Sequence, residues 1–345
     1  MSKTLKIIVL CAVVAVVGGM VLGGVLLVSG GLDREDTFTA HRESYATSLA
    51  GITTDLAAAD VRLYQSDGEA IEVLFYDSED QFFTLTEGEA GLHIERRRVP
   101  WYKDMWSAFY FRTRPYELEI GLPAGYTGTL VIETDSGNVH LEGLSLSSLA
   151  ITASSGDIRL ETVEAGALGI EVRSGNVRLT DVSAEANLSI THTSGDVRLE
   201  RVSCGGDLSA VGGSGVVRIE RVEAAGSVTL ENSSGGMIGG EVRCGGTLSA
   251  KARSGNIRLE EVTAAAIDAR CTSGNLRLRR MSADSIRLHA GSGNVNCSVT
   301  DSRARYTVLS RADSGSNDLP SGIFGTEKTL EVSTGSGNIH FEFDD

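Results

Sequence analysis

Proline and aromatic residues are scarce in this chain of 345 residues. Only 4 residues are proline and 6% are aromatic, whereas 41 are glycine. Glycine that is spread evenly without proline indicates many tight corners, and it excludes both a collagen-like rod and a proline-rich disordered segment. No stretch after residue 37 keeps a helical apolar period, so the sequence predicts an all-β protein.

Basic residues are also in the minority. The chain has 31 lysines and arginines against 46 aspartates and glutamates, which gives a net charge of −15. Because an acidic chain without a segment rich in lysine and arginine repels phosphate backbones, we expect no nucleic-acid partner.

The motifs of common catalytic and metal sites are missing. There is no HExxH pair, no GxSxG nucleophile elbow, no P-loop and no GxGxxG after a strand. The six histidines are scattered and make no metal-ligand spacing; they are His41, His93, His140, His192, His289 and His340. The sequence therefore predicts a protein that is not an enzyme, with no catalytic residues, no metal and no cofactor.

The longest uncharged run lies at the N-terminus. Residues 7–32 carry no charge and are long enough to cross the ~30 Å hydrocarbon layer as one transmembrane helix. Lys3 and Lys6 precede the run, so the positive-inside rule predicts a cytoplasmic tail at 1–6 and an extracytoplasmic remainder. A cleaved signal peptide is the alternative, which we weigh below a single-pass anchor in the cell membrane. The polar and acidic residues 33–50 are expected to form a linker.

One nine-residue sequence motif recurs along the chain. SGDVRLERV at 194–202 is nearly repeated at 155–163, 174–182 and 254–262. The glycine of each Ser-Gly pair marks the repeat, at Gly137, Gly156, Gly175, Gly195, Gly215, Gly235, Gly255, Gly274 and Gly293, with looser echoes at Gly315 and Gly337. A constant period of 19–20 residues is typical of a solenoid in which each repeat is one coil.

Apolar residues stand at the second, fourth and seventh positions after each marker glycine. Val197, Leu199 and Val202 are an example, and a second alternating run follows in each repeat, as at Leu188 and Ile190. This pattern predicts a single-domain parallel β-helix, right-handed by the crossover rule, with two strands in each coil. We expect regular coils over 136–300, a divergent cap or initial coils over 51–135, and irregular terminal coils over 301–345.

The residues around each corner form columns along the predicted solenoid. Asn or Asp after the marker glycine is expected to cap the turn, and calcium binding is the alternative; one carboxylate in some coils supplies too few oxygens. Arginines recur at the third position, at Arg159, Arg178, Arg198, Arg218, Arg258 and Arg277, and the fifth positions beside them are Glu161, Thr180, Glu200, Glu220, Glu260 and Arg279. We expect each guanidinium to be screened by a neighbouring carboxylate, which makes a solvated structural face; a polyanion-binding stripe is the alternative.

The coil register also makes a prediction for the cysteines. No two of Cys11, Cys204, Cys244, Cys271 and Cys297 form a CxxC pair. Cys204 and Cys244 would stand two coils apart, at ~10 Å, which exceeds the ~7 Å limit for a disulfide. Free thiols are expected.

One coil departs from the pattern. The sequence SGGMIGGEV places Ile238 where arginine is expected and Gly239 where leucine is expected. A slip of one residue would turn Ile238 inward and leave a bulge. We interpret this coil as a decayed repeat, and a docking notch is the alternative.

An aromatic cluster lies within the divergent segment. It comprises Trp101, Tyr102, Trp106, Phe109, Tyr110 and Phe111, and it contains both tryptophans of the chain. Burial as the core of the cap is the first interpretation, because aromatic residues are buried more often than they are exposed for recognition. A candidate interaction patch is the alternative.

Several of these features together resemble a known family. Repeated SGN and SGD coils, the Leu122-Pro123 step, the N-terminal apolar run and the terminal TGSGNI are similar to the bacterial putative-adhesin family of β-strand-repeat proteins, a domain of unknown function. The resemblance covers roughly residues 50–345. It implies a parallel β-helix at the cell envelope, and no catalytic or binding residues.

The function expected from these observations is adhesion or interaction at the bacterial cell envelope by a membrane-anchored extracytoplasmic solenoid. The membrane itself and a cell-wall glycan or envelope protein are the expected partners. Two alternatives stay open: a polymerising envelope scaffold like a bactofilin, and a β-helix polysaccharide lyase or hydrolase.

Overall fold

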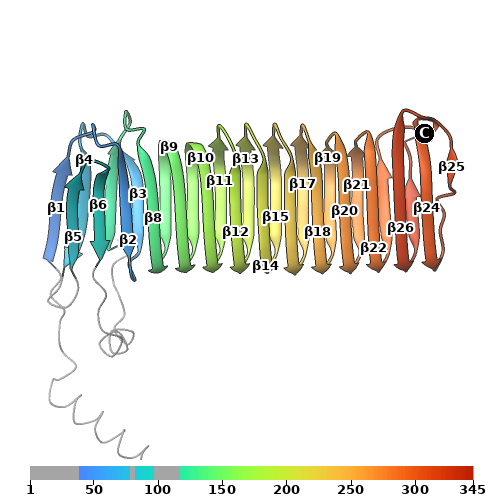
Figure 1. Ribbon diagram of the computed structural model, residues 1–345, viewed down its shortest axis with the longest axis horizontal. Coiled ribbons are helices and arrows are strands. Elements are labelled where there is room, and N and C mark those ends of the chain that lie inside the picture. Colours follow the sequence, from blue (N-terminus) through green and yellow to red (C-terminus); the bar gives the residue numbers. More distant parts are fainter. Residues whose placement is uncertain (1–38, 78–81, 97–116, 345) are drawn as a thin grey trace, which may run out of the picture.

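The protein is a straight rod built from parallel β-strands. The structure is a computed structural model that describes residues 39–77, 82–96 and 117–344. Figure 1 shows the strands side by side across the long axis, with the N-terminal part of the described chain at one end and the C-terminus at the other. The predicted all-β parallel β-solenoid is confirmed, with about ten rungs in one 27-stranded sheet.

Helix is almost absent from the described part of the chain, where a 3-10 turn at Arg303–Arg305 is the only one. None of the helical residues in those ranges makes a segment of the length and apolarity that a bilayer crossing needs. The predicted tail at 1–6 and transmembrane helix at 7–32 lie outside the described residues.

Each regular rung contributes one strand to each of two parallel ladders. The strands that follow the marker glycines form the first ladder: β11 (Val177–Ala184), β13 (Val197–Cys204), β15 (Val217–Ala224), β17 (Met237–Cys244), β19 (Ile257–Thr263), β21 (Leu276–Ser282), β23 (Val295–Val299) and β27 (Ile339–Glu342). The strands that precede them form the second ladder: β12 (Leu188–Ser194), β14 (Leu208–Ser214), β16 (Val228–Ser234), β18 (Thr247–Ser254), β20 (Ala266–Ser273), β22 (Ser285–Ser292) and β26 (Lys328–Ser336). In β9 (Val139–Ser155) and β10 (Ile158–Ser174) one unbroken strand serves both ladders.

The core lies between the two ladders and runs the length of the rod. Val197, Leu199 and Val202 of one rung are at most 1% exposed, and Leu188 and Ile190 on the second ladder are fully buried. Each stacks on its counterpart in the next rung, as Leu179 does on Leu199. The predicted inward positions are confirmed, and burial of these aliphatic side chains is the main favourable term in the stability of the stack.

The marker glycines make the corner between the ladders. Gly215 has a φ of +116°, and a Cβ added to it would lie 2.0 Å from the carbonyl oxygen of Gly195 in the rung below. Gly195 meets Gly175 in the same way. Both the left-handed backbone and the close approach of two rungs therefore require glycine at this corner.

A second corner is made by residues other than glycine. In seven successive rungs the residue just before the third inward position has a φ of 52–56°; these are Thr162, Asp181, Arg201, Arg221, Glu241, Glu261 and Arg280. The inward positions change there from even to odd spacing, and neighbouring strands stay in register on both sides of this residue, so the chain turns at the same place in each of these rungs. The sequence analysis did not identify this column of left-handed residues.

The irregular rung keeps its register, so the predicted one-residue slip is wrong. Gly239 stands between Ile219 and Leu259, and Ile238 stands between Arg218 and Arg258. A Cβ on Gly239 would lie only 2.7 Å from Leu259, because the larger neighbours fill the space that the missing side chain leaves. Ile238 consequently points outward and is 37% exposed.

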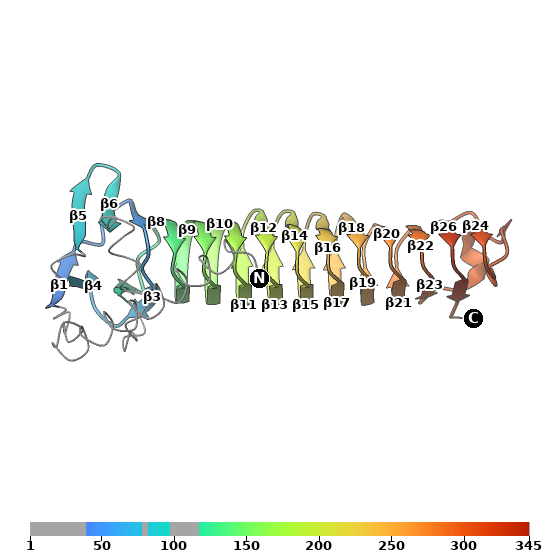
Figure 2. The same ribbon diagram turned by 90° about the horizontal axis from the view of Figure 1, so that it is seen from below.

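At the N-terminal end the order of the rungs in space differs from their order in the chain. The strands there are β1 (Thr39–Tyr45), β2 (Gly51–Leu56), β3 (Val61–Ser66), β4 (Ile71–Asp77), β5 (Phe83–Gly88), β6 (Gly91–Arg96), β7 (Leu118–Pro123) and β8 (Thr129–Ser136). The β2–β3 rung lies between the β8–β9 rung and an outer β6–β7 rung. Antiparallel β5 then pairs with β6, and antiparallel β4 and β1 extend from β7. The β5–β6 hairpin projects beyond the outline of the rod (Figure 2).

The C-terminal end is closed in a similar way. β26, near the end of the chain, lies directly against β22, and β24 (Tyr306–Ser314) lies outside it. The short β25 (Gly322–Ile323) then pairs antiparallel with β24. At this end Lys328 is buried and donates to Asp301 over 2.8 Å. At both ends an excursion of the chain covers the terminal rung, which protects an edge that could otherwise pair with another strand.

The cysteines within the described ranges are free, as predicted. Cys204, Cys244, Cys271 and Cys297 are buried and make no disulfide. Cys204 and Cys244 flank Ala224 in one column, so they stand two rungs apart. Burial raises the pKa of Cys271 to about 11 and that of Cys297 to about 12.

The glycine corner leads to a first prediction. Gly215→Ala forces an L-residue into a left-handed conformation, which costs about 1–2 kcal/mol, and it pushes two rungs apart. The urea midpoint of the full-length chain, followed by far-UV circular dichroism, should fall clearly. Gly169→Ala is the matched control, because a Cβ there meets nothing within 4 Å; its midpoint should be unchanged or higher. Equal midpoints for the two variants would contradict the role of the corner.

The buried thiols lead to a second prediction. Ellman's reagent should leave all four solenoid cysteines of the native chain unmodified at neutral pH, because each thiol is buried and protonated. Unfolding in denaturant without reductant should expose all four. Fewer thiols after unfolding would reveal a disulfide and contradict the register.

A third prediction concerns the buried His192. Its side chain is 3% exposed, neither ring nitrogen has a hydrogen-bond partner among the described residues, and burial lowers its pKa from the usual 6.5. The unfolded state therefore binds a proton that the folded state does not as the pH falls below 6.5, so stability is lost on that side. The melting temperature of His192→Leu should depend less on pH between about pH 8 and 5 than that of the wild type. A parallel pH dependence of the two proteins would argue against this assignment.

Candidate functional site

The sequence-predicted interaction patch lies outside the described residues. Trp101, Tyr102, Trp106, Phe109, Tyr110 and Phe111 all fall in the range 97–116. The candidate surfaces among the described residues lie on the solenoid.

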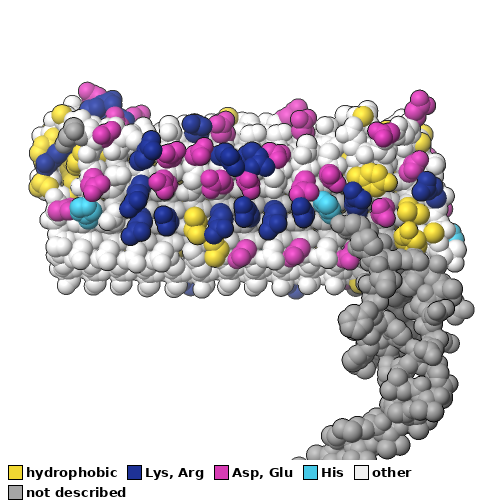
Figure 3. Space-filling view, turned by 180° about the vertical axis from the view of Figure 1, so that it is seen from behind, with side chains coloured by type: hydrophobic (Ala, Val, Ile, Leu, Met, Phe, Trp, Pro, Cys, Tyr) yellow, Lys and Arg dark blue, Asp and Glu magenta, His cyan; other side chains and the backbone are white. Residues whose placement is uncertain are grey.

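A row of arginines runs along the first ladder. It comprises the residues at the third position after the marker glycine: Arg159, Arg178, Arg198, Arg218, Arg258 and Arg277, with Ile238 between Arg218 and Arg258. Figure 3 shows this arginine row as a line of dark blue side chains along the rod, interrupted once by yellow. Strand alternation places every member on the outer face, and parallel in-register pairing sets them one rung apart, at ~4.8 Å.

Only some members of the row are paired with carboxylates. Arg159 Nη2 lies 2.6 Å from Glu161 Oε1, and Arg198 Nη2 lies 3.2 Å from Glu200 Oε2. The hydrogen bond from Arg159 lowers the pKa of Glu161. Glu200 also accepts from Arg201 and from Arg221, and the hydrogen bond from Arg201 contributes most to the lowering of its pKa.

The remaining members of the row have no such partner. Across the described ranges, no carboxylate lies within ion-pairing distance of Arg178, Arg218, Arg258 or Arg277. The expectation that every guanidinium is screened by a carboxylate is therefore wrong for four of the six arginines. In the rung of Arg178 the fifth position is Thr180. Arg258 makes no ion pair with Glu260, although both line a hollow around Ile238 together with Glu220, Glu241 and Glu261.

A ladder of Asn and Asp side chains runs beside the row. Asn138 Oδ1 accepts from the backbone N–H of Asp157, Asp157 Oδ1 from that of Asn176, and Asn176 Oδ1 from that of Asp196, over 2.9–3.0 Å. Each side chain thus caps the corner of the next rung rather than its own. The ladder is interrupted at Val216 and Gly236, which have no side-chain oxygen, and it continues from Asn256.

The ladder geometry is the structural arrangement expected at this corner. No group of three or more His, Cys, Asp or Glu side chains in the described part of the chain is placed to hold a metal ion. One oxygen of each corner side chain is already engaged by a backbone N–H, whereas calcium requires six to eight oxygen ligands.

Two long hollows lie between the arginine row and this ladder. The first is lined by Asp157, Asn176 and Asp196 on one side and by Arg159, Arg178, Arg198 and Arg218 on the other. The second is lined by Asn256, Asn275, Asn294 and Asn296 with Arg258 and Arg277, and it has no carboxylate in its lining. Each hollow thus presents guanidinium donors along one edge and amide or carboxylate groups along the other.

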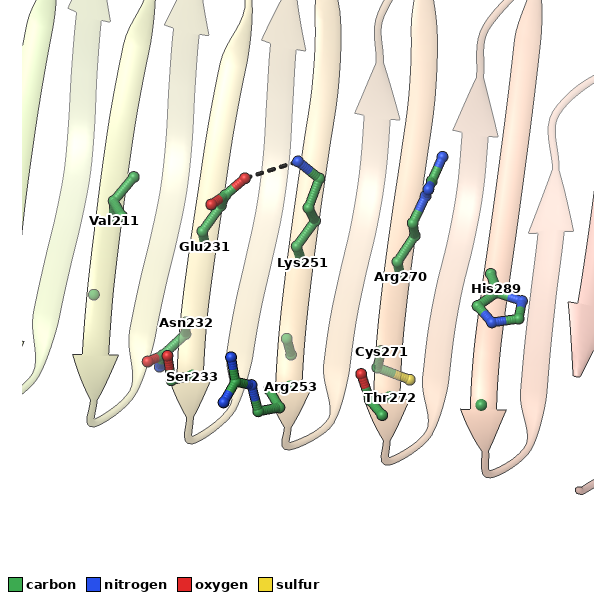
Figure 4. A pocket seen from close by; sticks show the side chains of 13 residues that line it. Val211, Glu231, Asn232, Ser233, Lys251, Arg253, Arg270, Cys271, Thr272 and His289 are labelled. Carbon is green, nitrogen blue, oxygen red and sulfur yellow. Dashed lines mark hydrogen bonds and ion pairs between the residues drawn. The ribbon is translucent and has the colours of Figure 1, made fainter. Parts of the chain in front are cut away.

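A third hollow lies over the second ladder (Figure 4). Its upper edge carries Glu231, which pairs with Lys251 over 2.8 Å, and Arg270 beside them. Small residues also line it, at Gly212, Ala252 and Gly291. His289 Nδ1 lies 2.9 Å from Ser333 Oγ at the far end.

The side chains that line these hollows include charged and hydrogen-bonding groups that can bind a ligand. Cys271 in the third hollow is a thiol whose pKa burial raises to about 11, so it is not an activated nucleophile. None of the hollows brings together a nucleophile, a base and an orienting group. The first two hollows share one arrangement, with arginines along one edge and Asn or Asp side chains along the other.

Comparison with known proteins identifies a family and two similar structures for this chain. The profile of the Toastrack DUF4097 family matches residues 50–237 and 242–345, and the gap falls in the irregular rung. A putative cell adhesion protein from Clostridium sporogenes ATCC 15579 is similar in structure, at 7% identity and TM-score 0.27 over 89% of this chain and 100% of its own. So is a putative adhesin from Bacteroides fragilis NCTC 9343, at 14% identity and TM-score 0.32 over 88% of this chain and 97% of its own. No curated protein matches in sequence. Since the family profile covers most of the chain, the protein belongs to the Toastrack DUF4097 family, which confirms the resemblance drawn from its SGN and SGD repeats.

Proposed function

We propose that this protein is a non-enzymatic, membrane-anchored rod that acts as an adhesion or interaction module at the cell envelope. The observation that carries the proposal is the regularity of the solenoid surface. The same outward positions recur at every rung from Val139 to Val299, so each side chain type becomes a column. A column presents many copies of one weak contact along a line, and multiple linked contacts give high avidity to a partner that spans them.

The ends of the rod support an interaction role over polymerisation. A filament of solenoids needs open terminal rungs that pair with the next molecule. Here β25 occupies part of the outer edge of β24, and the backbone N–H of Ser310 donates to Ser321 Oγ over 2.8 Å at the same edge. Contacts along the sides of the rod are therefore favoured over contacts through its ends.

The proposed location follows from the apolar run at 7–32, which would place the solenoid outside the cell membrane and the tail at 1–6 in the cytoplasm. In that position the ~50 Å regular stack can reach cell-wall glycan or an envelope protein. The names given to the two similar structures, from Clostridium sporogenes and Bacteroides fragilis, agree with such a role.

The location is tested by protease treatment of intact cells that produce the full-length chain. The solenoid should be digested in intact cells when an exposed loop carries an inserted cleavage site, and the N-terminal tail should be cut only after lysis. The chain should stay with the membrane in alkaline carbonate. A soluble chain, or a tail cut in intact cells, would contradict the anchor.

The binding role is tested with the full-length chain in detergent micelles and envelopes isolated from the source cells. The chain should be retained by the envelopes in a saturable manner, without release of new sugar ends or peptides. It should also stay monomeric by sedimentation at high concentration. Release of glycan fragments would favour an enzyme, and concentration-dependent filaments would favour a scaffold.

A further inference from the structure

The unpaired arginines of the row are spaced in a regular way. Arg178 and Arg218 stand two rungs apart, and Arg218 and Arg258 again stand two rungs apart, with one paired arginine and then Ile238 between them. Two rungs correspond to ~10 Å. Free guanidinium groups thus recur at about this interval along the rod, and Arg277 adds another one rung further on.

The groups beside the free arginines favour a hydroxyl-rich ligand. Asp157, Asn176 and Asp196 form the opposite edge of the first hollow, and each carboxylate has a second oxygen beyond the one that caps the next rung. These oxygens can accept from the hydroxyl groups of a sugar, whereas they would repel a dense polyphosphate or a nucleic acid.

A guanidinium group matches a carboxylate in shape and charge. Its planar fork donates two parallel hydrogen bonds, and an unpaired arginine does not first have to give up an intramolecular partner. Each sugar of an extended polysaccharide has a length close to the distance between two neighbouring rungs. A polysaccharide with one carboxylate in every disaccharide therefore carries successive carboxylates at an interval close to two rungs.

We propose that the arginine row and its two flanking hollows bind a linear acidic polysaccharide that carries one carboxylate per disaccharide. Arg178, Arg218 and Arg258 would each bind one carboxylate, and the Asn and Asp ladder would bind sugar hydroxyls. This inference rests on the proposed interaction role and names the chemical class of the ligand for the side of the rod.

Ile238 provides a test that does not depend on loss of function. Its side chain is exposed between Arg218 and Arg258 and is the only member of the row between them. Ile238→Arg would close the gap at this outward position, in a hollow that Glu220, Glu241, Glu260 and Glu261 also line. The variant should bind the acidic chain more tightly, since one more guanidinium contacts it.

The experiment measures binding of hyaluronan fragments, which carry one carboxylate per disaccharide, to the full-length chain in micelles by calorimetry at low and moderate salt. The double variant Arg178→Gln and Arg218→Gln should weaken binding by about three- to tenfold. The matched control is Arg173→Gln with Arg253→Gln. It removes the same charge from two exposed arginines of the second ladder that line neither hollow, and it should leave the affinity unchanged. Circular dichroism checks that all variants are folded.

The proposal stands if the row double variant loses affinity, the control retains it and Ile238→Arg gains it. Equal losses in the two double variants would show a general charge effect and overturn it. Equal binding of uncharged dextran, or tighter binding of polyphosphate or single-stranded DNA, would overturn it as well. If hyaluronan fails to bind while isolated envelopes still retain the wild-type chain, the ligand class is wrong and the interaction role survives.

Discussion

The structure depends on the close approach of successive rungs at the glycine corner. The carbonyl oxygen of Gly195 lies where Gly215 would carry a Cβ, and the same holds from Gly156 to Gly293. A rung that shifted along its neighbour would bring a side chain against that oxygen. The corner therefore fixes the register of both ladders, and the aliphatic core follows because inward positions then stack on one another.

A fixed register converts each surface position into a column, and the charge pattern of the rod follows from this. An arginine can pair with a carboxylate in its own rung, as Arg159 does, or in a neighbouring rung, as Arg201 does with Asp181. Because Glu200 attracts Arg201 and Arg221 as well as Arg198, carboxylates are not shared equally along the row. Like charges one rung apart remain tolerable because the guanidinium groups are exposed and screened by solvent.

The sequence was sufficient to predict the repeat, the inward residues and the glycine corner, since each is a local pattern that recurs along the chain, and the free cysteines followed from the register of that repeat. Other features have no local signal. Thr162, Asp181 and Arg201 occupy the left-handed corner in successive rungs. Because they are different residue types, the sequence carries no signal for this corner. The excursions that cover both ends depend on pairing across distant segments, such as β22 with β26. The choice of ion-pair partner depends on how the long side chains reach from one rung to another. Against expectation, Arg178 and Arg218 have no carboxylate partner in the part of the chain that the structure describes.

Closed ends and a periodic side together limit how such a rod can work. A ligand at the tip would meet irregular strands such as β24 and β25, which present each residue once. A ligand along the side meets the same group at intervals of one rung, so a partner with its own repeat gains a contact at every period. A compact partner would contact few rungs and gain little from the rest. In the proposed role, the length of the stack serves partners that are themselves extended, and the interrupted arginine row would set the spacing of charge that they carry.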